Sequence, residues 1–304
     1  MCLASIETAL SAVEQAAVDE VLLSALYSLP ETLLEREGLS GLRAKALAKL
    51  LEAYGDAPAT IEDEGRRAAF CRLSFQAVRA WVKADHLAVH SENCVVVLLS
   101  AWVNANAADL QLSPERLKEL SDSVRVEHCS LSYLAQILPN LPLFKADKER
   151  INMNVMERVS GTGVLGWGTG NAVKMRRLKE EQGMVCKTLD LSIIRDKLKE
   201  KGRLIYPSFY ANGFFFELFF IGDVDTPGIT LLLEKADLLD ILLDKEPAHD
   251  EFPNFFVPMT FQFNPNFPDI WTGSGIASSN GCSLSLGRGK LPNAESIDFK
   301  VKIQ

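Results

Sequence analysis

The sequence predicts an α+β protein, in which an N-terminal all-α helical domain is followed by a C-terminal antiparallel β-sandwich. Three features lead to this prediction. Apolar residues recur three or four positions apart up to about residue 158, which is the spacing of amphipathic helices. A glycine-rich run at residues 161–170 then interrupts the pattern. From about residue 183, aromatic and β-branched runs alternate with turn residues, which is typical of strands.

Composition and charge narrow the classes of function. The 304 residues are 47% apolar and 24% charged, which is typical of globular proteins with one large or two ordinary domains. The net charge is −8 and no basic stripe occurs, so we expect no nucleic-acid partner. We expect no membrane partner either, because no apolar run approaches the roughly 20 residues of a membrane-spanning helix. The N-terminal residues lack a signal-peptide pattern, which favours a cytoplasmic or nuclear protein.

The pattern of the six cysteines is also typical of a cytoplasmic or nuclear protein. None of them forms a C-x-x-C pair, and several fall on apolar faces of the expected helices. They are therefore interpreted as small buried side chains in a reducing compartment.

The stretch from Phe70 to Trp102 is the most informative part of the chain, and it contains no pattern typical of catalysis. Its first half predicts one amphipathic helix from apolar residues at helical spacing, namely Phe70, Leu73, Ala77, Val78 and Trp81. A polar elbow at residues 85–90 is expected to send Leu87 and Val89 inward and to leave its polar residues in water.

A second helix is expected after the elbow. Ser91 can cap its first free amides, and Glu92 complements the positive end of its dipole. Residues 94–102 are almost wholly apolar, which predicts a helix that is buried in the core.

Other helices are expected on both sides of this stretch. The apolar residues Leu42, Ala46, Leu50 and Tyr54 predict a helix that ends at Gly55. Ser113, Pro114 and Glu115 predict a helix start, with a serine cap and proline in the first turn. A further helical stripe is predicted from Leu131, Leu134, Ala135 and Leu138.

The strand signals fall in the last third of the chain. They occupy residues 209–221, 229–233, 255–263, 283–286 and 297–303. In the first of these, alternation predicts one face made of Phe214, Phe216, Leu218 and Phe220. The opposite face would hold Phe215, Phe219 and Ile221, so we interpret this run as a covered strand.

The central stretch closely resembles the BACK domain, the helical module that follows the BTB domain in BTB-BACK proteins. The residues that match the family motif are Leu73, Val78, Asp85, Leu87, Val89, Ser91, Glu92, Val95 and Trp102. The similarity extends upstream over residues 42–56 and downstream over residues 117–144. These are residues of cores and helix caps, so the resemblance implies a fold and structural roles rather than a named partner.

A second resemblance concerns residues 206–220, which are similar to the MATH, or TRAF-like, signature. It is carried by Ser208, Phe209, Gly213, Phe216 and Leu218, with Phe216 where that family usually has tryptophan. The resemblances together imply four segments. Residues 1–33 are similar to the last BTB helix and the first BACK helices, 34–158 are BACK-like, 159–182 form a glycine-rich linker, and 183–304 form a MATH-like sandwich.

BTB-BACK proteins typically serve as substrate adaptors of cullin-3 ubiquitin ligases, so the resemblance implies a non-catalytic adaptor with protein partners. The dimerising BTB body has no counterpart in the sequence. We therefore expect either that the chain is part of a longer product or that it acts through a BTB-containing paralogue. A general protein-binding scaffold without a ligase connection is the alternative.

A nucleotide-using enzyme is the remaining alternative, because Gly161, Gly163 and Gly166 spell G-x-G-x-x-G. A dinucleotide site needs a strand before this motif, whereas residues 151–159 have the pattern of a helix end. The motifs of a kinase catalytic loop and metal site do not occur. A flexible linker is therefore the preferred interpretation, and no catalytic residue and no cofactor are expected.

The remaining candidates are a pair of histidines that could bind a metal and several aromatic residues that could contact a partner. His86 and His90 are four residues apart, but they fall in the expected elbow rather than on a helix, so no metal is expected. Trp167 and Trp271 lie in expected glycine-rich loops, where an aromatic side chain suits a protein interface. The complete set of candidate interface residues is Trp167, Trp271, Tyr206, Phe209 and Tyr210.

Overall fold

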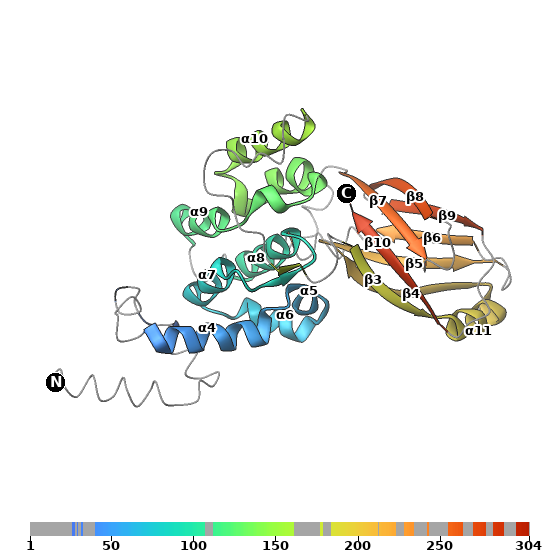
Figure 1. Ribbon diagram of the computed structural model, residues 1–304, viewed down its shortest axis with the longest axis horizontal. Coiled ribbons are helices and arrows are strands. Elements are labelled where there is room, and N and C mark those ends of the chain that lie inside the picture. Colours follow the sequence, from blue (N-terminus) through green and yellow to red (C-terminus); the bar gives the residue numbers. More distant parts are fainter. Residues whose placement is uncertain are drawn as a thin grey trace.

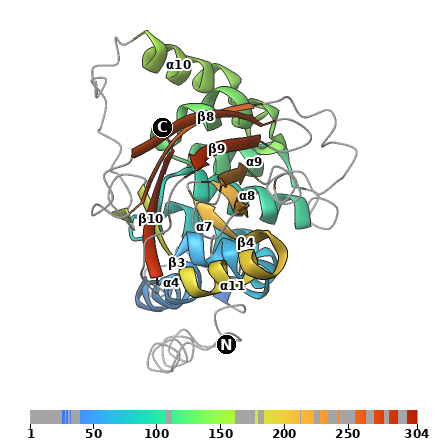
Figure 2. The ribbon, with the colours of Figure 1, turned by 90° about the vertical axis from the view of Figure 1, so that its right-hand side faces the viewer.

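The computed structural model places a helical region and a strand region at opposite ends of the molecule (Figure 1). Figure 2 looks onto the strand end, with the strands and α11 in front of the helical region. The structure describes residues 26–27, 29, 32, 40–106, 112–160, 177–178, 184–211, 213–222, 228–233, 242, 255–263, 270–277, 282–288 and 296–303.

The helical region holds seven α-helices among its described residues. They are α4 (Ser40–Tyr54), α5 (Ala57–Glu62), α6 (Glu64–Cys71), α7 (Phe75–Lys83), α8 (Asn93–Asn106), α9 (Pro114–Asp122) and α10 (Lys148–Val159). Between α9 and α10 the chain makes the short helical turns η2 (Val126–His128), η3 (Tyr133–Ile137), η4 (Leu138–Asn140) and η5 (Pro142–Phe144).

Helix α8 forms the centre of the core. Every residue from Asn93 to Val103 is buried, as the apolar run at residues 94–102 predicts. Helix α4 confirms the predicted stripe, since Leu42, Ala46 and Leu50 face the core and the helix ends before Gly55. Burial of each leucine or valine side chain in this core stabilises the fold by about 1.5–3 kcal/mol.

Side-chain caps set several helix starts. Asp56 Oδ1 accepts a hydrogen bond from Ala59 N at 3.0 Å, and Asp63 Oδ1 accepts from Arg66 N at 3.0 Å. The predicted start at Ser113 is confirmed, because its hydroxyl accepts from Arg116 N and Pro114 opens α9. Each cap satisfies an amide that the helix itself leaves without a partner.

The prediction of a single helix over the first half of the central stretch is wrong. The chain turns after Cys71, and a new helix, α7, begins at Phe75. Ser74 causes the break, because its hydroxyl accepts from Ala77 N and also donates to Tyr27 O at 3.0 Å. A serine that caps a helix competes with a continuous helical backbone.

Two expectations about the elbow also need correction. Ser91 Oγ is buried and has no hydrogen-bond partner among the described residues, so it does not cap α8. The backbone carbonyl of Ser91 accepts from Cys94 N instead. His90 is buried at 5% exposure rather than left in water, whereas Leu87 and Val89 point inward as predicted.

The stripe predicted from Leu131 to Leu138 is shifted. Leu131 and Ala135 are exposed, while Leu134 and Leu138 are buried. The segment forms a π-helical turn followed by 3₁₀ turns rather than a regular α-helix, so the 3.6-residue period does not apply. Tyr133 and Ile137 are buried in consequence.

The strands β3 to β10 form two four-stranded sheets, ordered β3-β10-β7-β8 and β4-β5-β6-β9, and neighbouring strands in both sheets are antiparallel. Their bounds are β3 (Met184–Asp190), β4 (Arg203–Ala211), β5 (Phe214–Ile221), β6 (Gly228–Leu233), β7 (Phe255–Phe263), β8 (Ile270–Ala277), β9 (Cys282–Arg288) and β10 (Ser296–Ile303). Helix α11 (Leu191–Lys201) follows β3, and a parallel pair joins β1 (Ala88–Val89) to β2 (Arg177–Leu178).

The apolar run expected as one strand at residues 209–221 is a hairpin. It turns at Gly213, whose φ of +94° suits glycine, and β4 pairs with β5 from Arg203↔Ile221 to Ala211↔Phe214. Alternation along β5 is confirmed on one face, because Phe214, Phe216, Leu218 and Phe220 are all buried. On the other face Phe215 is buried, Phe219 is half-buried and Ile221 is exposed.

Candidate interaction surfaces

The motif residues of the central stretch lie inside the helical region. Those that are buried are Val78, Leu87, Val89, Glu92, Val95 and Trp102. Leu73 is half-buried and packs against the same core. Apart from Asp85 and Ser91, which are partly exposed, the motif therefore builds the fold and offers little surface to a partner.

Asp85 and Glu92 both bind Arg125. The Asp85 carboxylate pairs with the guanidinium of Arg125, and Glu92 Oε1 accepts a hydrogen bond from Arg125 N at 3.1 Å. The elbow and the start of α8 thereby fix the chain that leaves α9. These two acidic residues of the motif are structural, because both bind within the chain.

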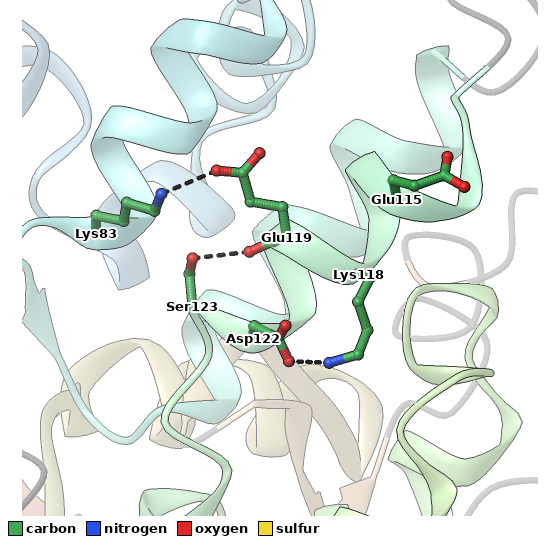
Figure 3. A pocket seen from close by; sticks show the side chains of 6 residues that line it. All are labelled: Lys83, Glu115, Lys118, Glu119, Asp122 and Ser123. Carbon is green, nitrogen blue, oxygen red and sulfur yellow. Dashed lines mark hydrogen bonds and ion pairs between the residues drawn. The ribbon is translucent and has the colours of Figure 1, made fainter.

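A charged hollow lies between α7 and α9 (Figure 3). Its volume is about 410 Å³, and it is lined by Lys83, Glu115, Lys118, Glu119, Asp122 and Ser123. Figure 3 shows Lys83 reaching toward Glu119 and Lys118 reaching toward Asp122. Arg79 also pairs with Glu119, so the hollow is bordered by an ionic network that spans both helices.

The pKa shifts in the hollow follow from this network. Burial acts to raise the pKa of Glu119, but the hydrogen bond from Lys83 and the charges of Arg79 and Lys83 outweigh burial and lower it. The hydrogen bond to Asp122, together with the interaction with Asp147, raises the pKa of Lys118. Both groups are held in their charged forms, in which they pair with other side chains of the same network.

A third feature is the contact of the β4–β5 hairpin with the helices. Tyr210, one of the expected interface residues, is fully buried in this contact. Its ring stacks on His90 at 6.2 Å between centroids and meets Phe215 edge to face at 5.2 Å. Its backbone N–H donates to Glu62 Oε1 at 3.1 Å. Tyr210 therefore makes a contact within the chain.

Three of the other four expected interface residues lie on strands. Tyr206 and Phe209 lie on β4 opposite Leu218 and Phe216, with an irregular register between them, and Trp167 lies outside the described residues. Trp271 lies in strand β8, paired with Phe261, and not in a loop as its glycine-rich surroundings suggested. The structure thus gathers Tyr206, Phe209 and Tyr210 on one strand and puts Trp271 in the other sheet.

In the part of the chain that the structure describes, no group of three or more histidine, cysteine or acidic residues could hold a metal ion. Burial raises the pKa of the Cys94 and Cys129 thiols. The glycine motif from Gly161 to Gly166 lies outside the described residues. No helix among the described residues is long and apolar enough to cross a bilayer.

Sequence reasoning missed the charged hollow and the exposed apolar side chains of α10. The charge spacing of Lys118 and Asp122, four residues apart on one helix, could have indicated the hollow. On α10 the exposed apolar residues are Met153, Met156 and Val159. Their three-residue spacing could have been noticed, but it does not distinguish an exposed face from a buried one.

Comparison with known proteins gives one match. Residues 61–139 match the model of the family BACK, described as BTB And C-terminal Kelch. The match runs from α5 to η4 and contains every motif residue predicted from the sequence, so the BACK resemblance of the helical region is confirmed over this segment. No curated protein and no solved structure matches the chain.

Proposed function

We propose that this protein is a non-catalytic interaction adaptor, related to the substrate adaptors of cullin-3 ubiquitin ligases. The observation that carries the proposal is the match of residues 61–139 to the BACK model. BACK domains occur in BTB and Kelch adaptors, where they connect a ligase-binding part to a substrate-binding part. The helical region would have that connecting role here.

The use of the motif residues supports a connecting role. Val78, Leu87 and Trp102 are buried, and Asp85 and Glu92 both bind Arg125. The characteristic residues of this module thus stabilise its own core and the connections between its helices. Such a module is suited to holding the binding surfaces of other domains in place. The interacting surfaces then belong to other parts of the chain or its assembly.

For the strand region we propose a β-sandwich, similar to MATH domains, that captures the substrate protein. The chain passes from one sheet to the other between β3 and β4, β6 and β7, β8 and β9, and β9 and β10. Repeated crossing between two antiparallel sheets is the connectivity of a sandwich, and it supports this proposal. Trp167, Trp271, Tyr206 and Phe209 remain the proposed capture residues.

The proposed partners are therefore a substrate protein and cullin-3, reached through a BTB domain in the same polypeptide or in a paralogue. The proposed location is the cytoplasm, the nucleus or both. The proposed adaptor function includes no cofactor and no catalytic step.

The ligase link can be tested by co-precipitation of the full gene product with cullin-3, with and without a co-expressed BTB-containing paralogue. We expect cullin-3 to be recovered in at least one of these two conditions. Recovery of substrate-like partners without cullin-3 in either condition would leave the general scaffold as the better description.

The capture role needs a separate experiment. We expect Trp271→Ala to reduce recovery of the partner proteins, while Glu149→Ala, at an exposed position of the helical region, leaves it unchanged. Circular dichroism would show that both variants are folded. Equal partner recovery for Trp271→Ala and the unmodified protein would remove Trp271 from the capture surface.

A further inference from the structure

The tip of the β4–β5 hairpin lies unusually close to the helical region. Gly213, at the tip, has a φ of +94°. A Cβ atom added there would lie 2.6 Å from Asn93 Cβ and 2.7 Å from two ring atoms of Tyr133. Carbon atoms in contact are normally about 3.5–4.0 Å apart, so only glycine fits both the backbone conformation and the space.

Tyr133 completes this contact with a hydrogen bond. Its hydroxyl donates to the carbonyl oxygen of Gly213, and the bond is buried. Burial also raises the pKa of Tyr133 well above its usual value, so the hydroxyl keeps the proton that it donates. The Tyr133 ring packs edge to face on Phe214 at 5.1 Å.

The part of the helical region that contacts the hairpin tip is held in place by its own hydrogen bonds. Asn93 Nδ2 donates to Ser130 Oγ at 3.1 Å, and Ser130 N donates to Asn93 Oδ1 at 3.0 Å. These two bonds join the start of α8 to the turn before η3. The position of Asn93 is therefore set without the hairpin.

A second point of attachment lies on the same hairpin. Tyr210 N donates to Glu62 Oε1 at 3.1 Å, and the Tyr210 ring stacks on His90. The residues Glu62, His90, Asn93 and Tyr133 thus form one socket, which we call the hairpin socket. They come from α5, the elbow, α8 and η3, so the hairpin contacts four separate segments of the helical region.

We propose that the hairpin socket, filled by the β4–β5 hairpin of the same chain, locks the helical and strand regions into one rigid body. Domains joined by a linker usually move relative to each other unless their interface is well packed. Here a glycine tip, two aromatic rings, one buried hydrogen bond and one partly buried hydrogen bond fix the relation. The lock stands on these contacts alone; its consequence, a fixed distance between ligase-binding and substrate-binding surfaces, rests on the proposed function.

The lock can be tested with a matched pair of glycine variants. Gly222 also has a positive φ, +102°, but a Cβ added there meets nothing within 4 Å. Gly213→Ala therefore adds strain and a clash with the socket, whereas Gly222→Ala adds strain alone. Labels introduced by non-natural amino acids at Lys49 and Lys199, both exposed, would report the distance between the two regions in the full chain.

We expect one narrow distance distribution for the unmodified chain and for Gly222→Ala, and a broad distribution for Gly213→Ala. Tyr133→Phe keeps the ring and removes only the hydroxyl, so it serves if Gly213→Ala fails to fold. Loss of one buried hydrogen bond should raise the open fraction about tenfold. A broad distribution in the unmodified chain, or identical narrow ones in Gly213→Ala, Tyr133→Phe and Gly222→Ala, would overturn the proposal.

Light scattering distinguishes a lock within one chain from exchange between two chains. We expect the mass of a monomer under conditions where the narrow distance distribution is seen. A dimer in which doubly labelled chains keep the narrow distance after dilution with unlabelled chains would retain the lock, because that distance then lies within one chain. A narrow distance that arises between two singly labelled chains would instead place the hairpin in the socket of a second copy and overturn the assignment.

Discussion

The indole N–H of Trp102 donates a hydrogen bond to the backbone carbonyl of Leu73 at 2.8 Å. The bond joins the two ends of the central stretch, from the turn before α7 to the second half of α8. Trp102 is fully buried, so water cannot replace this bond if it is lost. The same residue fills the core and ties down the turn that separates α6 from α7.

This bond leads to a prediction for Trp102→Phe. The variant keeps an aromatic ring but leaves the Leu73 carbonyl without its donor and creates a cavity. We expect a loss of about 1–3 kcal/mol from the unsatisfied carbonyl, with a further loss from the cavity. Urea denaturation followed by circular dichroism measures the change. Met156→Leu, on an exposed position of α10, is the control and should change stability by less than about 0.5 kcal/mol.

Trp81 offers a comparison for the same prediction, because its indole N–H donates to Tyr54 O at 2.9 Å and its ring is also buried. Trp81→Phe should be destabilised to a similar extent. If neither variant unfolded at a lower urea concentration, the indole bonds would not contribute to stability.

A second prediction concerns the two carboxylates that hold Arg125. Glu92→Ala leaves the Arg125 N–H without an acceptor in a buried place, which should cost about 1–3 kcal/mol. Asp85→Ala removes an ion pair whose acid is 41% exposed, and should cost no more than about 1 kcal/mol. Glu92→Gln retains an amide oxygen as acceptor and should fall between wild type and Glu92→Ala.

Chemical denaturation at low and high salt separates the two effects. Only the cost of Asp85→Ala should shrink as salt screens the pair. An equal cost for Asp85→Ala and Glu92→Ala would contradict the different roles assigned to the two carboxylates.

Much of the helical region could be predicted from the sequence because its signals are local. The apolar run of α8, the stripe of α4 and the serine-proline start of α9 each specify an element within a few residues. The break at Ser74 was missed, because the continuous apolar spacing from Phe70 to Trp81 favoured a single helix, although serine is a residue type that often caps helices. Where two local signals compete, the pattern alone does not show which one prevails.

The hairpin socket could not be predicted in this way. Its bonds join residues far apart in the chain, 80 positions for Tyr133 and Gly213 and 148 for Glu62 and Tyr210. The aromatic residues of the hairpin were visible, and Tyr210 stood out as a contact residue. Nothing local distinguishes an aromatic side chain that meets another protein from one that meets another part of its own chain.

A third prediction follows from the lowered pKa of Glu119. A carboxylate whose pKa is lower in the folded state stabilises the fold above its unfolded pKa. That contribution is lost as pH falls from the ordinary glutamate range through the folded pKa. We expect Glu119→Gln to be less stable than wild type at pH 7, with the difference shrinking in acid. Denaturation of both proteins over a pH series measures it.

Glu115 is the control for this titration, because it lies at the edge of the same hollow and is fully solvated at the start of α9. The hydrogen bond with Ser113 lowers its pKa too, but no basic side chain is involved. High salt should therefore reduce the effect of Glu119→Gln more than that of Glu115→Gln. A pH-independent difference between wild type and Glu119→Gln would show that the ionic network is not coupled to folding.

The last prediction concerns the order in which the thiols react. Burial raises the pKa of Cys71, Cys94 and Cys129. Cys94 and Cys129 are buried, whereas Cys71 is half-buried and the charges of Arg67 and Arg72 oppose the rise there. The thiolate is the reactive form, so both burial and a raised pKa slow alkylation. We expect iodoacetamide to modify Cys71 before Cys94 and Cys129 in the native protein, with the latter two protected until the fold opens. Peptide mass spectrometry over time gives the three rates, and urea-unfolded protein, in which the three should react alike, is the reference. Modification of Cys94 as fast as Cys71 in the native protein would mean that α8 opens readily, and that its N-terminal part is not a stable centre of the core.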